Sequence, residues 1–195
     1  MKLNEIKEHI RSAFKLSDEE ASIFLSKFSI VKLNKYDVFA EKGKICNEIG
    51  LIKKGLMKCV YYKNGNEVVF EFAYESSFIA DYYSFVTNTP SEKEIRCLEE
   101  TTLYVINRQD LEILARTYLF VQKINRKMNE NLFLKTHNRL KSFLLQTPLE
   151  RYQMLIAQRQ DLAQRIPQYL IASYLNVKPE TISRIRKRIA SKEIY

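Results

Sequence analysis

The sequence predicts an α+β protein: an antiparallel β-roll with flanking helices, then a long helix and a small C-terminal helical domain. Short β-rich runs separated by turns fill residues 29–106, which also hold all four glycines. No proline or glycine interrupts residues 110–146, as expected of a long helix. Residues 138–195 contain 11 lysines and arginines against 4 carboxylates, a net charge of +7, whereas the first 137 residues carry only +2. We therefore expect a β-roll domain over 1–115, a helical linker over 116–137 and a basic domain over 138–195.

The N-terminal segment predicts two short helices, over roughly 3–14 and 18–27. In "KLSDEEASIFLSKFS", Ser17 precedes Glu20 by three residues, which is the capping-box spacing at the start of a helix. The β-rich runs that follow are "SIVKL", "DVFAE", "EIGLI", "LMKCVYY", "EVVFEFA" and "TLYVI". Several short strands at regular spacing favour a jelly-roll or double-stranded β-helix.

The clearest local signal is the hairpin "YYKNGNEVVF". Asn64 and Gly65 stand between two aromatic and β-branched runs, and this dipeptide accepts the positive φ angles of a type I′ turn. We expect a tight hairpin centred on these two residues.

The linker helix carries a short apolar seam at alternating spacings of three and four. It consists of Val121, Ile124, Met128 and Asn131, with Leu132 beyond. We expect this seam to meet the same helix of a second subunit, with Asn131 as a polar residue that fixes the register. The alternative is that the stripe packs on the β-roll of its own chain.

Composition excludes several classes of protein. No run approaches the roughly 18 apolar residues of a membrane-spanning helix. Cys46, Cys59 and Cys97 are odd in number and widely spaced, as in the reduced thiols of a cytoplasmic protein. His9 and His137 have no metal-type spacing with a cysteine or carboxylate. We therefore expect a cytoplasmic protein with no metal, no cofactor and no membrane contact.

The C-terminal stretch "IPQYLIASYLNVKPETISRIRKR" predicts two short helices joined by a tight turn. Pro167 and Pro179 suit the first turns of the two helices, and Asn176 suits a positive φ between them. Ala172 is small enough for a crossing helix to approach closely. The apolar face of the first helix consists of Leu170, Ile171 and Leu175, and that of the second of Ile182, Ile185 and Ile189.

The opposite face of the second helix is polar and basic, which is typical of a helix-turn-helix laid in a DNA major groove. Arg184 can donate two hydrogen bonds to guanine, and Glu180 can accept one from cytosine. Thr181, Ser183 and the helix N-terminus could bind phosphate. Sequence-independent attraction to phosphates is expected from Lys178, Arg186, Lys187 and Arg188. The alternative is an ordinary helical hairpin with a solvated charged face.

At this point the sequence resembles the Crp/Fnr family of bacterial transcription regulators, most of all the short proteins of Bacteroidetes. The order of β-roll, long helix and C-terminal helix pair matches over nearly the whole chain. "IPQYLIASYLNVKPETISRIRKRI" resembles the family's DNA-reading motif, and "GKICNEIGLIKKGLMKCVYYKNGNE" its glycine-punctuated β-roll. The resemblance implies a cyclic-nucleotide-binding-like sensor over 1–115, a dimerisation helix over 116–137 and a helix-turn-helix over 138–195.

The resemblance also implies which residues contact DNA. Glu180 and Arg184 fall at the family's base-reading positions, while Pro179 stands where some members have a further arginine. The full expected set is Gln168, Lys178, Pro179, Glu180, Thr181, Ser183, Arg184, Lys187 and Arg188. The sequence ends six residues after Ile189, so we expect the β-wing that usually follows to be either missing from the protein or outside the given sequence.

The sensor departs from the cyclic-nucleotide-binding pattern. Ala80-Asp81-Tyr82 stands in place of the family's Gly-Glu-Leu step, and Ser91-Glu92 in place of its phosphate-binding Arg-Ser pair. Arg96 follows too late for that role on this alignment, although a shift of the loop could bring it there. Without a cation a buried phosphate is strongly disfavoured, so we expect neither cyclic AMP nor cyclic GMP as the ligand. Any pocket would involve Phe78, Ile79, Ala80, Asp81, Tyr82, Ser91 and Glu92.

These observations predict a homodimeric, sequence-specific transcription regulator whose partners are double-stranded DNA, a second copy and, by the resemblance, RNA polymerase. Its small-molecule effector is left open, and a β-roll that binds no ligand is an equal alternative. The alternative is a β-roll sensor whose basic helices contact RNA, lipid or protein. No G-x-S-x-G, P-loop, G-x-G-x-x-G or H-E-x-x-H motif is present, so we do not expect an enzyme.

Overall fold

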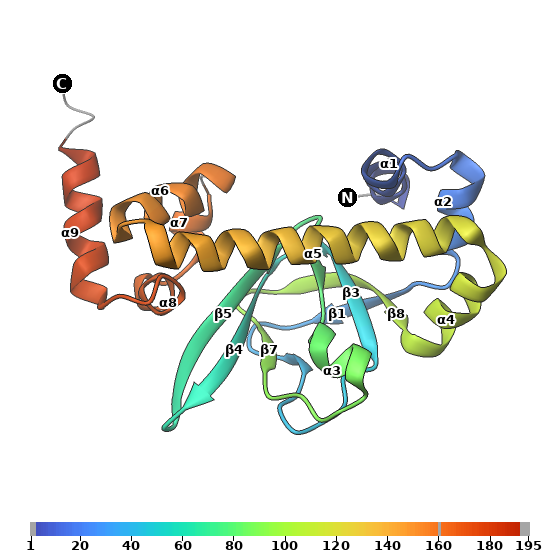
Figure 1. Cartoon of the computed structure of the whole chain (residues 1–195), viewed down its shortest axis with the longest axis horizontal. Helices are drawn as coiled ribbons and strands as arrows, with labels where there is room; N and C mark the ends of the chain where they lie inside the picture. The colour runs from blue at the N-terminus through green and yellow to red at the C-terminus, as the bar shows by residue number, and fades with distance from the viewer. Residues whose placement is uncertain (1–2, 160, 192–195) are drawn as a thin grey trace. The chain divides into compact units, whose positions relative to one another are not determined.

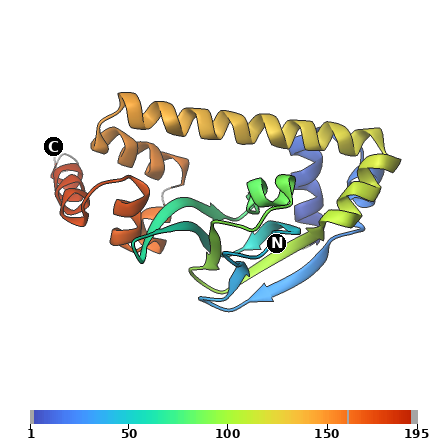
Figure 2. The same ribbon diagram turned by 60° about the horizontal axis from the view of Figure 1, so that its bottom comes forward.

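The computed structural model describes residues 3–159 and 161–191, which fall into two compact units. Unit 1 comprises Met1–Tyr61 and Glu71–Asn131, and unit 2 comprises Tyr62–Phe70 and Leu132–Tyr195. Helix α5 (Leu119–Leu145) contributes to both and runs without a break (Figures 1 and 2). No helix in the described ranges is long and apolar enough to cross a membrane.

Unit 1 is built on two four-stranded sheets (Figure 1). The first has the order β1 (Ser29–Leu33), β8 (Thr101–Asn107), β3 (Glu48–Lys54), β6 (Phe78–Ile79). The second has the order β2 (Val38–Ala40), β7 (Glu94–Cys97), β4 (Leu56–Lys63), β5 (Asn66–Tyr74). The pairings β1–β8, β3–β8, β3–β6, β2–β7 and β4–β7 are all antiparallel, which confirms the predicted antiparallel β architecture.

All six predicted β-runs form strands, but the short strands β6 and β7 were not predicted. In β7, Ile95 and Cys97 are fully buried while Glu94 and Arg96 form an ion pair. Four residues with two charges among them give too short an alternation to identify a strand from the sequence.

The helices of unit 1 are α1 (Leu3–Phe14), α2 (Asp18–Leu25), α3 (Tyr82–Thr87) and α4 (Arg108–Thr117). The predicted capping box is present at α2: the Ser17 hydroxyl accepts from the Glu20 amide, and the Glu20 carboxylate accepts from the Ser17 amide. One apolar cluster joins α1, α2, α4 and the start of α5 to the first sheet. Its buried members are Ile6, Ile10, Ala21, Phe24, Ile49, Leu51, Phe85, Tyr104, Ile106, Leu114, Val121 and Ile124.

The helical conformation is interrupted between α4 and α5, where the sequence predicted one continuous helix. Tyr118 is extended, with φ −128° and ψ 119°, and ends α4. Tyr118 and Phe120 pack against the apolar cluster, with ring centroids 5.5 Å apart. The extended residue lets α4 and α5 approach the same cluster from different directions.

Three residues of the predicted subunit seam on α5 contact the apolar cluster of their own unit. Val121 and Ile124 are 0% and 1% exposed, and Met128 packs against the same cluster. These three side chains pack against the β-roll of their own chain, as the alternative interpretation expected. Asn131 is exposed, and Leu132 is 37% exposed.

Unit 2 contains the C-terminal half of α5 and helices α6 (Pro148–Gln158), α7 (Leu162–Arg165), α8 (Gln168–Tyr174) and α9 (Pro179–Ala190). The predicted cap of α6 is present, since Thr147 and Glu150 form a capping box around Pro148.

The predicted hairpin tip also belongs to unit 2. Asn64 and Gly65 have φ angles of 51° and 78°, as a type I′ turn requires. The Val69 amide donates to the Ser173 hydroxyl of α8 at 2.9 Å.

Candidate nucleic-acid interface

A tight turn joins α8 to α9 and sets one helix across the other (Figure 1). Asn176 adopts φ +53°, the left-handed conformation predicted for it. The Val177 amide donates to the Ala172 carbonyl at 3.0 Å, which closes the turn. Lys178 is then extended, and α9 begins at Pro179. The corner is therefore fixed by backbone geometry as well as by packing.

The inner faces of α8 and α9 form a small apolar core, as their spacing predicted. Ile182 is fully buried and Ile185 is 8% exposed. The other buried members in this unit are Tyr152, Leu155, Leu162, Ile166, Leu170, Ile171, Ala172 and Leu175. Burial of these side chains fixes which face of α9 points away from the protein.

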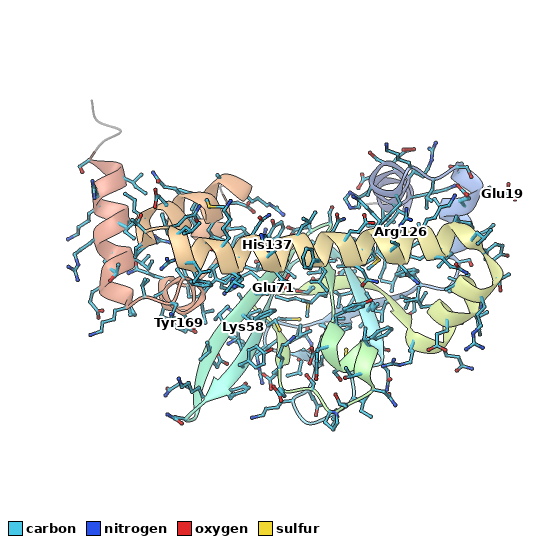
Figure 3. All side chains as sticks on the ribbon, in the orientation of Figure 1. Glu19, Lys58, Glu71, Arg126, His137 and Tyr169 are labelled. Carbon is cyan, nitrogen blue, oxygen red and sulfur yellow. The ribbon has the colours of Figure 1, made fainter. Side chains whose placement is uncertain are left out.

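The outward face of α9 is polar and charged. Its exposed residues are Lys178, Pro179, Glu180, Ser183, Arg184, Lys187 and Arg188, while Thr181 is half-buried. Gln168 is half-buried in α8, and its side-chain amide donates to the Pro179 carbonyl at 3.0 Å and to the Ser183 hydroxyl at 3.2 Å. Gln168 thus holds the first turn of α9 in place. Tyr169, labelled in Figure 3, is 60% exposed on α8.

Other cations of this unit point inward, which sequence spacing did not reveal. Arg186 donates to the Tyr152 hydroxyl at 3.0 Å and to the Ala163 carbonyl at 2.8 Å, so it does not join the phosphate-facing set expected for it. Arg139 donates to the Tyr174 carbonyl and Arg151 to the Leu175 carbonyl, both at 3.1 Å, at the end of α8. Part of the +7 charge therefore supports the helix pair.

The C-terminal half of α5 exposes apolar side chains in a heptad-like order. Phe133, Leu140 and Leu144 are 68%, 60% and 73% exposed. His137 lies between them and stacks on Phe133, with ring centroids 6.0 Å apart (labelled in Figure 3). The spacing of four, three and four is that of a coiled-coil seam.

In the β-roll, the structure brings together Asp81 and Ser91 from the predicted pocket set and adds Lys93. The Lys93 ammonium lies 2.8 Å from one Asp81 carboxylate oxygen, and the Ser91 hydroxyl donates to the other at 2.5 Å. Asp81, Ser91 and Lys93 are 1%, 3% and 9% exposed. The cluster thus contains a buried cation, Lys93, which the sequence analysis did not identify.

Two features separate this cluster from the rest of the predicted pocket set. Phe78, Ala80 and Tyr82 pack against the helix-side apolar cluster, and Glu92 is exposed. Arg96 pairs with Glu94 and donates to the Tyr36 carbonyl instead of supplying a pocket cation. Lys93 follows Ser91 by two residues in a loop before β7, and no signal in the sequence indicated that its side chain would be buried beside Asp81.

Burial alone would raise the pKa of the Asp81 carboxyl, but hydrogen bonds from Lys93 and Ser91 outweigh burial, so this pKa is lowered. Burial would likewise lower the pKa of Lys93, but Asp81 raises it above its usual value. Both groups therefore remain charged at neutral pH. Burial raises the pKa of the neighbouring Cys59 thiol to about 12, so this thiol stays protonated.

The three cysteines are buried and free. Within the described part of the chain, no group of three or more histidine, cysteine, aspartate and glutamate side chains could hold a metal ion.

Comparison with known proteins identifies the fold. Residues 30–118 match the family model of the cyclic nucleotide-binding domain. No match was found among curated proteins. Among solved structures, FixK2 from Bradyrhizobium japonicum has a TM-score of 0.75 at 13% identity, over 86% of each chain.

Two further solved structures extend this likeness. A regulator assigned to the Crp/Fnr family from Eubacterium rectale has a TM-score of 0.66 at 13% identity, over 91% of this chain and 85% of that one. The catabolite activator protein of Thermus thermophilus has a TM-score of 0.54 at 19% identity, over 91% and 85%. The structures that share this fold thus include Crp/Fnr transcription regulators.

Proposed function

We propose that this chain is a sequence-specific DNA-binding transcription regulator of the Crp/Fnr type, acting as a homodimer. The observation that carries the proposal is the orientation of α9. Its isoleucines Ile182 and Ile185 are buried against the rest of unit 2, so Glu180 and Arg184 are presented outward on one exposed face. A helix held this way can enter the major groove as the second helix of a helix-turn-helix.

Side-chain chemistry suggests a role for each polar residue on and beside this face. Arg184 reads guanine by two parallel hydrogen bonds, and Glu180 accepts a hydrogen bond from a cytosine amine. Lys178, Lys187 and Arg188 contact the phosphate backbone, which gives affinity without sequence preference. Thr181 and Ser183 supply hydroxyls to the same backbone. Gln168 positions α9 through its hydrogen bonds to Pro179 and Ser183.

Dimerisation uses the exposed stripe of Phe133, His137, Leu140 and Leu144. A second copy of the chain suits this surface, because identical stripes in a heptad order can pack against each other about a two-fold axis. The charged first half of α5 differs: Arg126 and Glu130 lie on the corresponding positions and pair with each other. Two copies would place two α9 helices on half-sites about one helical turn apart.

The test is a selection of bound duplexes from random DNA, repeated with two variants of the same helix face. The wild type should enrich a near-palindromic site. Arg184→Ala should lose discrimination at one base pair of each half-site by roughly 5- to 150-fold, because a bidentate contact is lost. Lys187→Ala, the control, should weaken all duplexes alike and lower the salt slope by about one.

Two results would contradict the proposal. Wild-type protein that enriches no sequence at moderate salt is not a sequence-specific regulator. If Arg184→Ala and Lys187→Ala weaken binding equally on every duplex, α9 serves as a general basic surface for RNA, lipid or protein.

A further inference from the structure

The β-roll of unit 1 buries an ion pair beside its apolar interior. Asp81 precedes α3 and Lys93 precedes β7, and their charged atoms lie 2.8 Å apart. Ser91 fastens the pair: its hydroxyl donates to Asp81 and accepts from the Lys93 amide at 3.1 Å. Lys93 also lies over the Tyr61 ring, with its ammonium 5.5 Å from the centroid.

A buried ammonium is costly unless an anion neutralises it. The domain family that matches residues 30–118 is described as cyclic nucleotide-binding, and such a ligand brings a negatively charged phosphate. In this chain a carboxylate of the protein already lies against the buried cation. A phosphate entering here would need to displace Asp81 from Lys93 and would place a second negative charge beside the displaced carboxylate. The residues present therefore do not fit an added phosphate.

We propose that Asp81 takes, from within the chain, the place of an anionic ligand. Its carboxylate neutralises Lys93 and connects the start of α3 to the start of β7, so the β-roll reaches its folded state with no bound cyclic nucleotide. The site is an anion site that the protein fills itself. One consequence rests on the proposed function: the protein binds its operator without an effector.

Removing Asp81 should turn this self-filled site into a site for a small external anion. Asp81→Ala removes the carboxylate that lies against the buried Lys93 ammonium and opens space for another one, so Tm should fall by about 10 °C in chloride buffer. Formate at about 100 mM should then recover at least about 3 °C, because it binds only the folded state. The same addition should leave the wild-type Tm unchanged.

Two control variants separate this effect from general salt stabilisation. Glu41→Ala breaks an exposed ion pair with Lys44, so neither the substitution nor formate should shift its Tm appreciably. Lys93→Met should lower Tm by an amount similar to Asp81→Ala, but formate should not restore it, because no buried cation remains.

Titration of the wild type tests the same inference without any substitution. Cyclic AMP and cyclic GMP at about 1 mM should each leave its Tm unchanged, since neither gains binding energy at a filled site. If Asp81→Ala folds in formate but not in chloride, the inference is supported. If Asp81→Ala folds in neither buffer, the titration of the wild type with cyclic AMP and cyclic GMP tests the inference alone.

The inference is overturned if either cyclic nucleotide raises the wild-type Tm by several degrees. It is also overturned if formate stabilises Asp81→Ala no more than Glu41→Ala. These melting curves contain no DNA, so a failure of the proposed DNA binding would leave their outcome untouched.

Discussion

Neighbouring cations of α9 lie in different environments although the sequence presents them as one basic run. Arg184, Lys187 and Arg188 are exposed, whereas the Arg186 guanidinium is hydrogen-bonded to α6 and to the Ala163 carbonyl of α7. Helical spacing alone places Arg186 at the edge of the apolar face. Only the position of Tyr152 in α6 shows that this arginine has partners within the protein.

Because their environments differ, two matched substitutions should affect different properties of the protein. Arg186→Met should lower the free energy of unfolding by about 2 kcal/mol, because two hydrogen bonds from a charged group are lost and the Tyr152 hydroxyl loses a donor. Arg188→Met should leave stability nearly unchanged and weaken DNA binding. Denaturant unfolding and operator titration of both variants measure the two effects. If the two variants are equally stable, Arg186 has no structural role.

At the scale of secondary structure, the corner between α8 and α9 depends on one backbone conformation. Asn176 has φ +53°, which is costly for most residues and free for glycine. The helices on either side are short, at 7 and 12 residues, so their stability comes mainly from the buried faces that the turn brings together.

Substitution at this turn should follow backbone preference. Asn176→Ala should destabilise the protein by about 1 kcal/mol, and Asn176→Gly should be close to neutral. The same change in a helix, Asn138→Ala in α5, should be neutral or slightly stabilising. Thermal unfolding of the three variants checks this order. An Asn176→Gly variant less stable than Asn176→Ala would show that the asparagine side chain, not its backbone angle, holds the turn.

At the scale of the whole molecule, the exposed stripe on α5 is the surface through which we propose that two copies pair. Phe133 and Leu140 are both more than half exposed, although large apolar side chains favour burial. The stripe lies in unit 2, C-terminal to the seam first expected, where the apolar residues Val121, Ile124 and Met128 pack on the β-roll.

We expect the wild type to be a dimer at micromolar concentration. The double substitution Phe133→Glu and Leu140→Glu should give a monomer, since two buried charges would face their copies across the two-fold axis. Operator affinity should fall roughly 100-fold or more, because the two half-sites are no longer bound by one linked pair. Analytical ultracentrifugation and operator titration measure both results.

Val86→Glu, at a side chain 61% exposed on α3, is the control and should remain dimeric. A wild type that sediments as a monomer, or a double variant that remains a dimer, would exclude this surface as the interface.

Local features of this protein could be predicted from its sequence. The two capping boxes, the Asn64-Gly65 turn, the positive φ of Asn176 and the isoleucine face of α9 all depend on residues within a few positions of one another. Their energies are set by short-range hydrogen bonds and backbone sterics, which a single sequence records directly. The six predicted strands followed for the same reason.

Other features depend on which distant segments of the chain are in contact. Only the tertiary structure determines these contacts. The α5 seam faces inward because the first sheet lies beneath it, and Arg186 is engaged because α6 and α7 pack beside α9. Lys93 donates a hydrogen bond to Asp81, which lies twelve residues earlier in the sequence, and helix α3 lies between the two residues in the chain. Spacing along the chain determines which face of an element is apolar, but the neighbour that covers this face, or neutralises a charge on it, is set by long-range packing.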